Sequence, residues 1–440
     1  MRWILTLALL APSPNAQAQC ARPRADLSAL AIEGRHAEAA AGGEALAHDD
    51  ADCERDEVLF DAGREHAAAG TIDDALRVWR QLRSEHPASR WPEAALWLEA
   101  STLESVARYE EAASAYEDFA LRYPASVETD CPTQRRCPNA MEGLQLALYL
   151  RLGLHQLGAA TADVEQFERL YLRRYPREAA AVSHALGRAY QDDGRHQSAV
   201  NHYSLWLAVF DERADIDVRL RARLALAHAL TELGRADRAR PHLESIVRLW
   251  DAEAPLHHGL ADRDALLVMA ARDGAAAARV LLADPAVAAF LSTRPSGNTL
   301  ENVEPWLEAR RAELASIRVR LEEVARYEIP EHNITVTERI GRMHRHLVDR
   351  VRATGLPEPT ADELVAPDRA AAIAAYEFCA TTATQMRWVT ATSERCVSAL
   401  DDMLDRPGAH ELHGREELQD ARAAPPPLAS REDGPGPVAR

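Results

Sequence analysis

Residues 59–87 read LFDAGREHAAAGTIDDALRVWRQLRSEHP, two amphipathic segments on either side of Gly70. The positions that carry the pattern are Leu59, Gly63, His66, Gly70, Ala75, Trp79 and Pro87. Glycine adopts a left-handed turn at little cost because it has no Cβ, and proline ends a helix because it has no N–H to donate. The stretch therefore predicts two antiparallel helices joined by a tight turn, the second of which ends at Pro87.

The same order of residue types recurs along the chain, as expected of stacked structural repeats. A second copy contains Leu96, Ala100, Leu103, Tyr109, Ala112, Tyr116 and Pro124. Two later copies contain Leu186, Gly187, Tyr190, Gly194, Ala199 and Tyr203, and then Leu226, Ala227, Leu230, Gly234, Ala239 and Leu243. A degenerate copy spans 146–176, with Gly158 at its turn and Phe167 as its aromatic residue, and a half copy lies at Gly34, Arg35, His36 and Ala39. Small anchors such as Gly63 and Gly187 let paired helices approach while aromatic residues fill the space beyond.

These anchors, over residues 55–250, resemble the tetratricopeptide repeat superfamily. The endings His86-Pro87, Tyr123-Pro124 and Tyr175-Pro176 are similar to those of envelope proteins such as the lipoprotein that assists outer-membrane β-barrel assembly. The resemblance implies an all-α protein, a right-handed α-solenoid of antiparallel helical hairpins. It also implies a scaffold that binds protein or peptide partners of the cell envelope.

Composition narrows the classes of partner and of chemistry. The formal net charge is -18, which argues against nucleic acid because its recognition needs a basic surface. All 51 basic residues are arginine, so chemistry that depends on a lysine amine is excluded. We expect basic or neutral partners.

The N-terminus has the features of an export signal. An apolar run, 3–11, follows Arg2, and the sequence Ala16-Gln17-Ala18 fits the cleavage rule for secretory signals. We expect 1–18 to be removed and the mature chain to reach the periplasm, where it could associate with the outer membrane. A lipid anchor at Cys20 is the disfavoured alternative, because Gln19 stands where lipoprotein signals have glycine or alanine before the cysteine. The sequence has no later run of about 18 apolar residues, so we expect no other segment to span a membrane.

Export would permit disulfides, and the sequence holds six cysteines. Pairing between neighbours in the sequence joins Cys20 with Cys53, Cys131 with Cys137, and Cys379 with Cys396. Zinc ligation by the middle pair is the alternative, but no second Cys or His pair stands at zinc spacing nearby.

The predicted domains are a signal peptide (1–18), a solenoid of a half repeat and about five repeats (19–250), a helical region (251–405) and a disordered proline-rich tail (406–440). In the helical region we expect helices at 260–291, 303–327, 334–353 and 368–404. Cys379 and Cys396 lie almost equally far from a turn near Arg387 and would face each other across an antiparallel pair of helices.

An insert at 127–140 interrupts the repeats. After Ala112 the next residue at the small-anchor position is Asp163, which is further along the chain than one repeat period. We favour a disulfide-stapled loop that bridges two repeats. The alternative is a rigid protrusion that presents Arg135 and Arg136 to an acidic partner.

A rotation of about 100° per residue places certain first-helix residues on the concave face of a solenoid. These groove candidates are Phe60, Arg64, Trp97, His184, Arg188, Leu224 and His228. Aromatic and arginine side chains dominate binding hot spots. The alternative for Phe60, Trp97 and Leu224 is packing against the next repeat.

Motifs for catalysis are weak, and we assign no catalytic residue, metal ligand or cofactor. His344 and His346 are two apart and would lie on different faces of a helix. His257 and His258 lie among acidic residues and could hold a metal, although solvated loop histidines are the simpler interpretation. The predicted function is a non-enzymatic interaction scaffold. The alternative is an envelope hydrolase or metal-binding protein with its site in 251–405.

Overall fold

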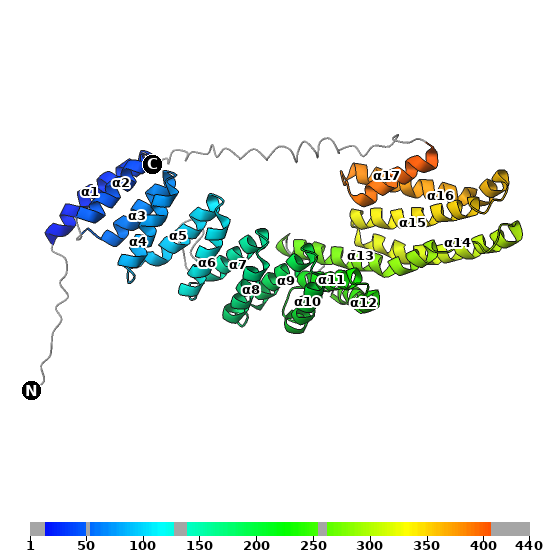
Figure 1. Cartoon of the computed structure of the whole chain (residues 1–440), viewed down its shortest axis with the longest axis horizontal. Helices are drawn as coiled ribbons and strands as arrows, with labels where there is room; N and C mark the ends of the chain where they lie inside the picture. Colours follow the sequence, from blue (N-terminus) through cyan, green and yellow to red (C-terminus); the bar gives the residue numbers. More distant parts are fainter. Residues whose placement is uncertain (1–13, 50–52, 127–138, 254–261, 406–440) are drawn as a thin grey trace, which may run out of the picture. The chain divides into compact units, whose positions relative to one another are not determined.

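The computed structural model describes residues 14–49, 53–126, 139–253 and 262–405, and all regular secondary structure in them is helical. The chain divides into two compact units, one up to Ala214 and one from Asp215 (Figure 1). Most of the predicted signal peptide, nearly all of the insert with Cys131 and Cys137, and the predicted tail lie outside the described residues.

Unit 1 is built from consecutive antiparallel helices. Its helices are α1 (Pro14–Ile32), α2 (His36–Asp49), α3 (Arg55–Ala68), α4 (Ile72–Glu85), α5 (Trp91–Ser105), α6 (Tyr109–Arg122), α7 (Ala140–Gly153), α8 (Leu157–Tyr171), α9 (Pro176–Asp192) and α10 (His196–Phe210). Each helix packs mainly against the next one along the chain, with smaller contacts between α3 and α5 and between α7 and α9. This packing between near neighbours makes unit 1 an all-α solenoid, as the sequence predicts.

The turns inside the hairpins share one backbone geometry. A residue with positive φ follows the first helix of each hairpin, at Gly34, Gly70, Ala107, His155, Gly194 and Gly234. The next residue donates its N–H to a carbonyl in the last helical turn, for example Thr71 to His66 at 3.0 Å. This is the Schellman arrangement, which satisfies the carbonyls that a helix end leaves open. The left-handed turns predicted at Gly70 and Gly194 are confirmed.

Because Ala107 holds this left-handed conformation with a Cβ, its turn is strained, whereas the equivalent Gly70 is not. We expect Ala107→Gly to raise the free energy of unfolding by about 1 kcal/mol and Gly70→Ala to lower it by a similar amount. A Cβ at Gly70 would meet no atom within 4 Å, so backbone strain alone would cause the loss. Urea unfolding of the two variants measures both effects, and a stabilised Gly70→Ala would contradict the prediction.

The anchor glycines permit direct contact between a helix backbone and an aromatic ring. A Cβ at Gly63 would lie 2.3 Å from Nε1 of Trp79, and a Cβ at Gly187 would lie 2.6 Å from Cζ of Tyr203. Both rings are fully buried. The expectation that small anchors bring paired helices together is confirmed at these two positions.

The degenerate third repeat begins its second helix at a different register from the one predicted. The left-handed residue is His155, whereas Gly158 lies inside α8. A buried alanine stands five residues after the left-handed residue in every one of these hairpins, which identifies Ala160 as the anchor in place of Asp163. The sequence predicts the turn at Gly158 because glycine favours a left-handed backbone. In the structure the same Schellman hydrogen bonds form at His155.

Unit 2 contains the fifth repeat together with the C-terminal helices. Its helices are α11 (Ile216–Glu232), α12 (Ala236–Glu253), α13 (Asp262–Leu291), α14 (Leu300–Glu322), the short 3-10 helix η2 (Glu323–Tyr327), α15 (Pro330–Arg352), α16 (Glu358–Gln385) and α17 (Ala391–Leu404). The sequence placed a boundary near residue 250. In the structure α13 packs against both α11 and α12, so this repeat belongs with the helices that follow it.

The sequence predicts no later apolar run long enough to span a membrane, and helix α13 contradicts this prediction. Val268–Leu291 is long and apolar enough to cross one by length and composition. Two charged residues within it pair with other helices, Arg279 with Asp251 at 3.2 Å and Asp284 with Arg339 at 2.5 Å. Helix α13 also packs against α11, α12, α14 and α15, which bury part of this apolar surface.

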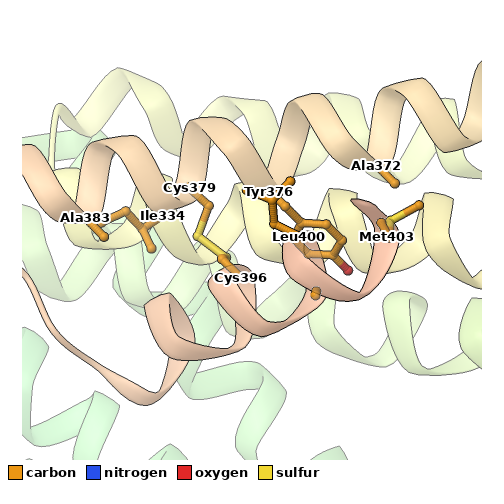
Figure 2. Packing of buried hydrophobic residues seen from close by; sticks show 9 residues of the cluster. Ile334, Ala372, Tyr376, Cys379, Ala383, Cys396, Leu400 and Met403 are labelled. Carbon is orange, nitrogen blue, oxygen red and sulfur yellow. A yellow bond between two sulfur atoms is a disulfide. The ribbon is translucent and has the colours of Figure 1, made fainter. Parts of the chain in front are cut away.

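Two disulfides form in the pairings that the sequence favoured. Cys20 of α1 is bonded to Cys53, and Cys379 of α16 is bonded to Cys396 of α17. The chain turns between α16 and α17 at Arg387, whose φ is 51°, and the predicted helix at 368–404 is divided there. Figure 2 shows the second disulfide within a buried cluster shared by α15, α16 and α17.

Candidate functional site

Two of the predicted groove residues are core residues, which corrects the sequence interpretation. Phe60 is 6 % exposed and stacks on Trp91 of the next repeat, with ring centroids 4.4 Å apart. Trp97 is 4 % exposed and makes edge contacts with Tyr116 and Phe119. Their side chains fill the space between consecutive hairpins, so neither can serve as an exposed binding anchor. This is the packing alternative that the sequence left open.

The other candidates in unit 1 lie on or near the surface. Arg64 is exposed, pairs with Asp61 at 3.4 Å, and lines a pocket of about 250 Å³ formed by α1, α2 and α3. Arg188 has a side chain 74 % exposed and lies 3.7 Å from Asp192. His184 is half-buried against Tyr203, with ring centroids 5.6 Å apart. The structure does not gather these three side chains into one site.

The remaining two candidates lie on α11 of unit 2, beside a larger cavity. Leu224 is half-buried, and His228 is exposed and lines a groove of about 530 Å³ between α11, α12 and α13. We call this cavity the α11–α13 groove. Its wall is mostly apolar, and its lining includes Asp237, Leu243, Leu281 and Ala288.

The α11–α13 groove combines the features of a peptide site. Leu243 and Leu281 provide apolar surface from two helices, and Ala288 contributes a small side chain to the same wall. Asp237 is exposed at the rim and has no ion pair among the described residues. An apolar cavity with a few polar groups at its edge is the usual form of a binding site. Sequence reasoning identified His228 but missed the α13 wall, because α13 lies outside the repeat pattern.

No protein-family model and no curated protein matches this sequence. Solved structures do match. MamA shares 16 % identity with a TM-score of 0.30, over 47 % of this chain and 97 % of MamA. A tetratricopeptide repeat protein from Parabacteroides merdae shares 13 % identity with a TM-score of 0.28, over 80 % of this chain and 99 % of that one.

A third structure, from a putative kinesin light chain of Podosopora anserina with TPR-like repeats, shares 17 % identity with a TM-score of 0.28. It matches over 46 % of this chain and 97 % of its own length. These TM-scores are low, so the repeat architecture of this chain rests on its own helix pairing and turn geometry.

A buried charged cluster occupies the core of the third repeat. Arg151 of α7 is 8 % exposed and contacts Glu117 of α6 through two nitrogens, at 2.7 and 3.2 Å. Asp163 of α8 is 5 % exposed, and its Oδ2 has no hydrogen-bond partner. Burial, with a smaller contribution from Glu117, raises the pKa of Asp163 from 3.8 to about 7. The sequence pattern pointed to Asp163 only as the anchor residue of the third repeat, a position that Ala160 occupies in the structure.

The histidines of α15 have separate structural partners. Nδ1 of His344 lies 2.9 Å from Asp368 of α16, and Nε2 of His346 lies 3.0 Å from the carbonyl of Thr293. They point to different neighbours, as their spacing predicts. Within the described ranges no group of three His, Cys, Asp or Glu side chains is placed to hold a metal ion. His257 and His258 lie outside those ranges.

Proposed function

We propose that this protein is a non-enzymatic scaffold that binds a partner peptide or helix in the α11–α13 groove. The observation that carries the proposal is the groove itself, a mostly apolar cavity of about 530 Å³ bounded by three helices. A repeat solenoid is suited to this task because each hairpin adds surface without altering the core of the others.

The chemistry of the groove defines the partner segment. An apolar side chain would insert between Leu243 and Leu281, since transfer of apolar area out of water drives such binding. A basic residue beside it would pair with Asp237 at the rim. The net charge of -18 attracts basic segments over a longer range.

We further propose that the scaffold acts in the cell envelope, in the periplasm or at the outer membrane. Two disulfides support an oxidising compartment. The Cys20 thiol is consumed in the bond to Cys53, which favours a protein without a lipid on that sulfur. The signal peptide that the sequence predicts at 1–18 also supports export.

Ala288→Trp is the variant that tests the groove, because Ala288 is exposed on α13 and lines the cavity. Peptides selected from a random display library on the purified protein provide the ligand, and fluorescence polarisation measures their affinity. We expect the indole to fill the groove and to weaken binding at least about tenfold. The selected peptides should combine apolar residues with arginine or lysine.

Ala289→Trp is the matched control, since Ala289 is the neighbouring exposed residue of α13 and does not line the groove. It should bind the selected peptides as the wild type does. If Ala288→Trp also binds them with unchanged affinity while remaining folded by circular dichroism, the groove is not the peptide site. Selection of no peptide at all would equally contradict the proposal.

A further inference from the structure

A second cavity, of about 410 Å³, lies in the C-terminal part of unit 2 between α15 and α17. Glu338, Arg342, Arg345 and Asp349 line it from one face of α15, at the spacing of successive helical turns. Arg395 of α17 lines the opposite side. We call this cavity the arginine pocket. It shares no lining residue with the α11–α13 groove.

The arginines of this pocket are not equally neutralised. Arg342 and Arg395 approach the same oxygen, Oε1 of Glu338, at 3.8 and 3.4 Å. Two guanidinium groups therefore share one carboxylate, which is itself buried, and one positive charge is left over. In contrast, Arg345 has two carboxylates of its own, at 3.2 and 3.6 Å. The surplus positive charge lies on the side of Glu338.

An unsatisfied hydroxyl lies on the same side. Tyr376 of α16 is 2 % exposed, yet it lines the pocket, and its hydroxyl has no hydrogen-bond partner among the described residues. The charged groups that act electrostatically on this hydroxyl, Glu338, Arg345, Arg342 and Asp349, all line the pocket. The ring of Tyr376 is buried, whereas its hydroxyl oxygen is not among the fully buried polar atoms and is open to the pocket. It can therefore donate a hydrogen bond to a water or a ligand there.

The fold supports this placement of Tyr376. Its ring lies against Gly341 of α15, where a Cβ would come within 2.9 Å of Cε1. The ring belongs to the cluster around the Cys379–Cys396 disulfide, and Figure 2 shows it beside Leu400 of α17. Burial raises the pKa of Tyr376 above its ordinary value, so the hydroxyl stays a hydrogen-bond donor at neutral pH.

We propose that the arginine pocket binds a small oxyanion, a phosphate or a carboxylate group, that accepts a hydrogen bond from Tyr376 and pairs with Arg342 and Arg395. A planar guanidinium group can donate two parallel hydrogen bonds to a pair of oxygens of a phosphate or a carboxylate. The side chains of Arg342 and Arg395 are 44 % and 54 % exposed and can turn toward a ligand. The volume admits a small organic acid or phosphate ester.

Isothermal titration calorimetry of the full chain tests the proposal with inorganic phosphate and with succinate as probes. Sodium chloride at equal ionic strength is the reference. We expect saturable binding of at least one probe, and the tighter one identifies the preferred anion. Tyr376→Phe removes only the hydroxyl and should weaken binding about tenfold, as expected for a hydrogen bond to a charged group. Arg395→Gln should weaken it by at least as much.

Arg318→Gln is the control, because Arg318 is an exposed arginine of α14 that pairs with Glu322 outside the pocket. It should bind as the wild type does. Without probe, Tyr376→Phe should be at least as stable as the wild type, since its hydroxyl has no partner to lose. The proposal is overturned if both probes behave as chloride does, or if Tyr376→Phe and Arg395→Gln both retain wild-type affinity.

Discussion

Gly63→Ala is expected to lower the free energy of unfolding by about 2–3 kcal/mol, although alanine is the better helix former. The new Cβ would lie 2.3 Å from Nε1 of Trp79, a ring that is 1 % exposed and has no room to move aside. The α3–α4 pair must separate to relieve the overlap, which breaks the closest contact of that hairpin. Chemical denaturation followed by circular dichroism measures the loss.

Gly153→Ala is the matched control. Gly153 lies at the end of α7, and a Cβ there would meet no atom within 4 Å. The same chemical change should therefore raise stability by about 0.5–1 kcal/mol through helix propensity. In a solenoid the damage from Gly63→Ala should remain local, so hydrogen exchange should quicken in α3, α4 and α5 and stay unchanged in unit 2. Equal effects of the two substitutions would refute the packing explanation.

Asp163→Asn is expected to stabilise the protein at pH 8 by about 2–4 kcal/mol and to change it little at pH 4. The folded-state pKa of Asp163 is raised from 3.8 to about 7, so the folded chain binds more protons than the unfolded chain between these values. Wild-type stability should therefore fall as pH rises from about 4 to about 7, and then level off. Thermal or urea unfolding across this range gives the difference between variant and wild type at each pH.

Glu165→Gln provides the comparison for this experiment, because Glu165 is an exposed carboxylate on the same helix. Its difference from the wild type should be small, because the substitution changes no buried charge. Asp163→Asn retains the shape of the side chain, so a loss of stability at pH 8 would mean that the charge of Asp163 supports Arg151. That result would show that the attraction to Arg151 exceeds the cost of burial.

The amino-acid sequence was sufficient for features that depend on neighbours along the chain. The turns at Gly70 and Gly194 follow from residue type alone, because only a few residues tolerate a left-handed backbone at low cost. The hairpin closed by Cys379 and Cys396 was predictable because the two cysteines lie almost equally far from Arg387. Helix propensity and the hydrophobic period likewise sufficed for an all-α chain.

Only the tertiary structure decided which faces of these helices remain open. Phe60 and Trp97 have the residue types of binding anchors, yet Phe60 is covered by Trp91 of the following hairpin and Trp97 packs against α6 of its own hairpin. The groove beside His228 exists because α13, which carries no repeat pattern, forms its third wall. The arginine pocket brings together four helices through residues as far apart as Leu291 and Ala399. A local pattern sets the conformation of one helix, whereas burial and charge balance depend on which other helices pack against it.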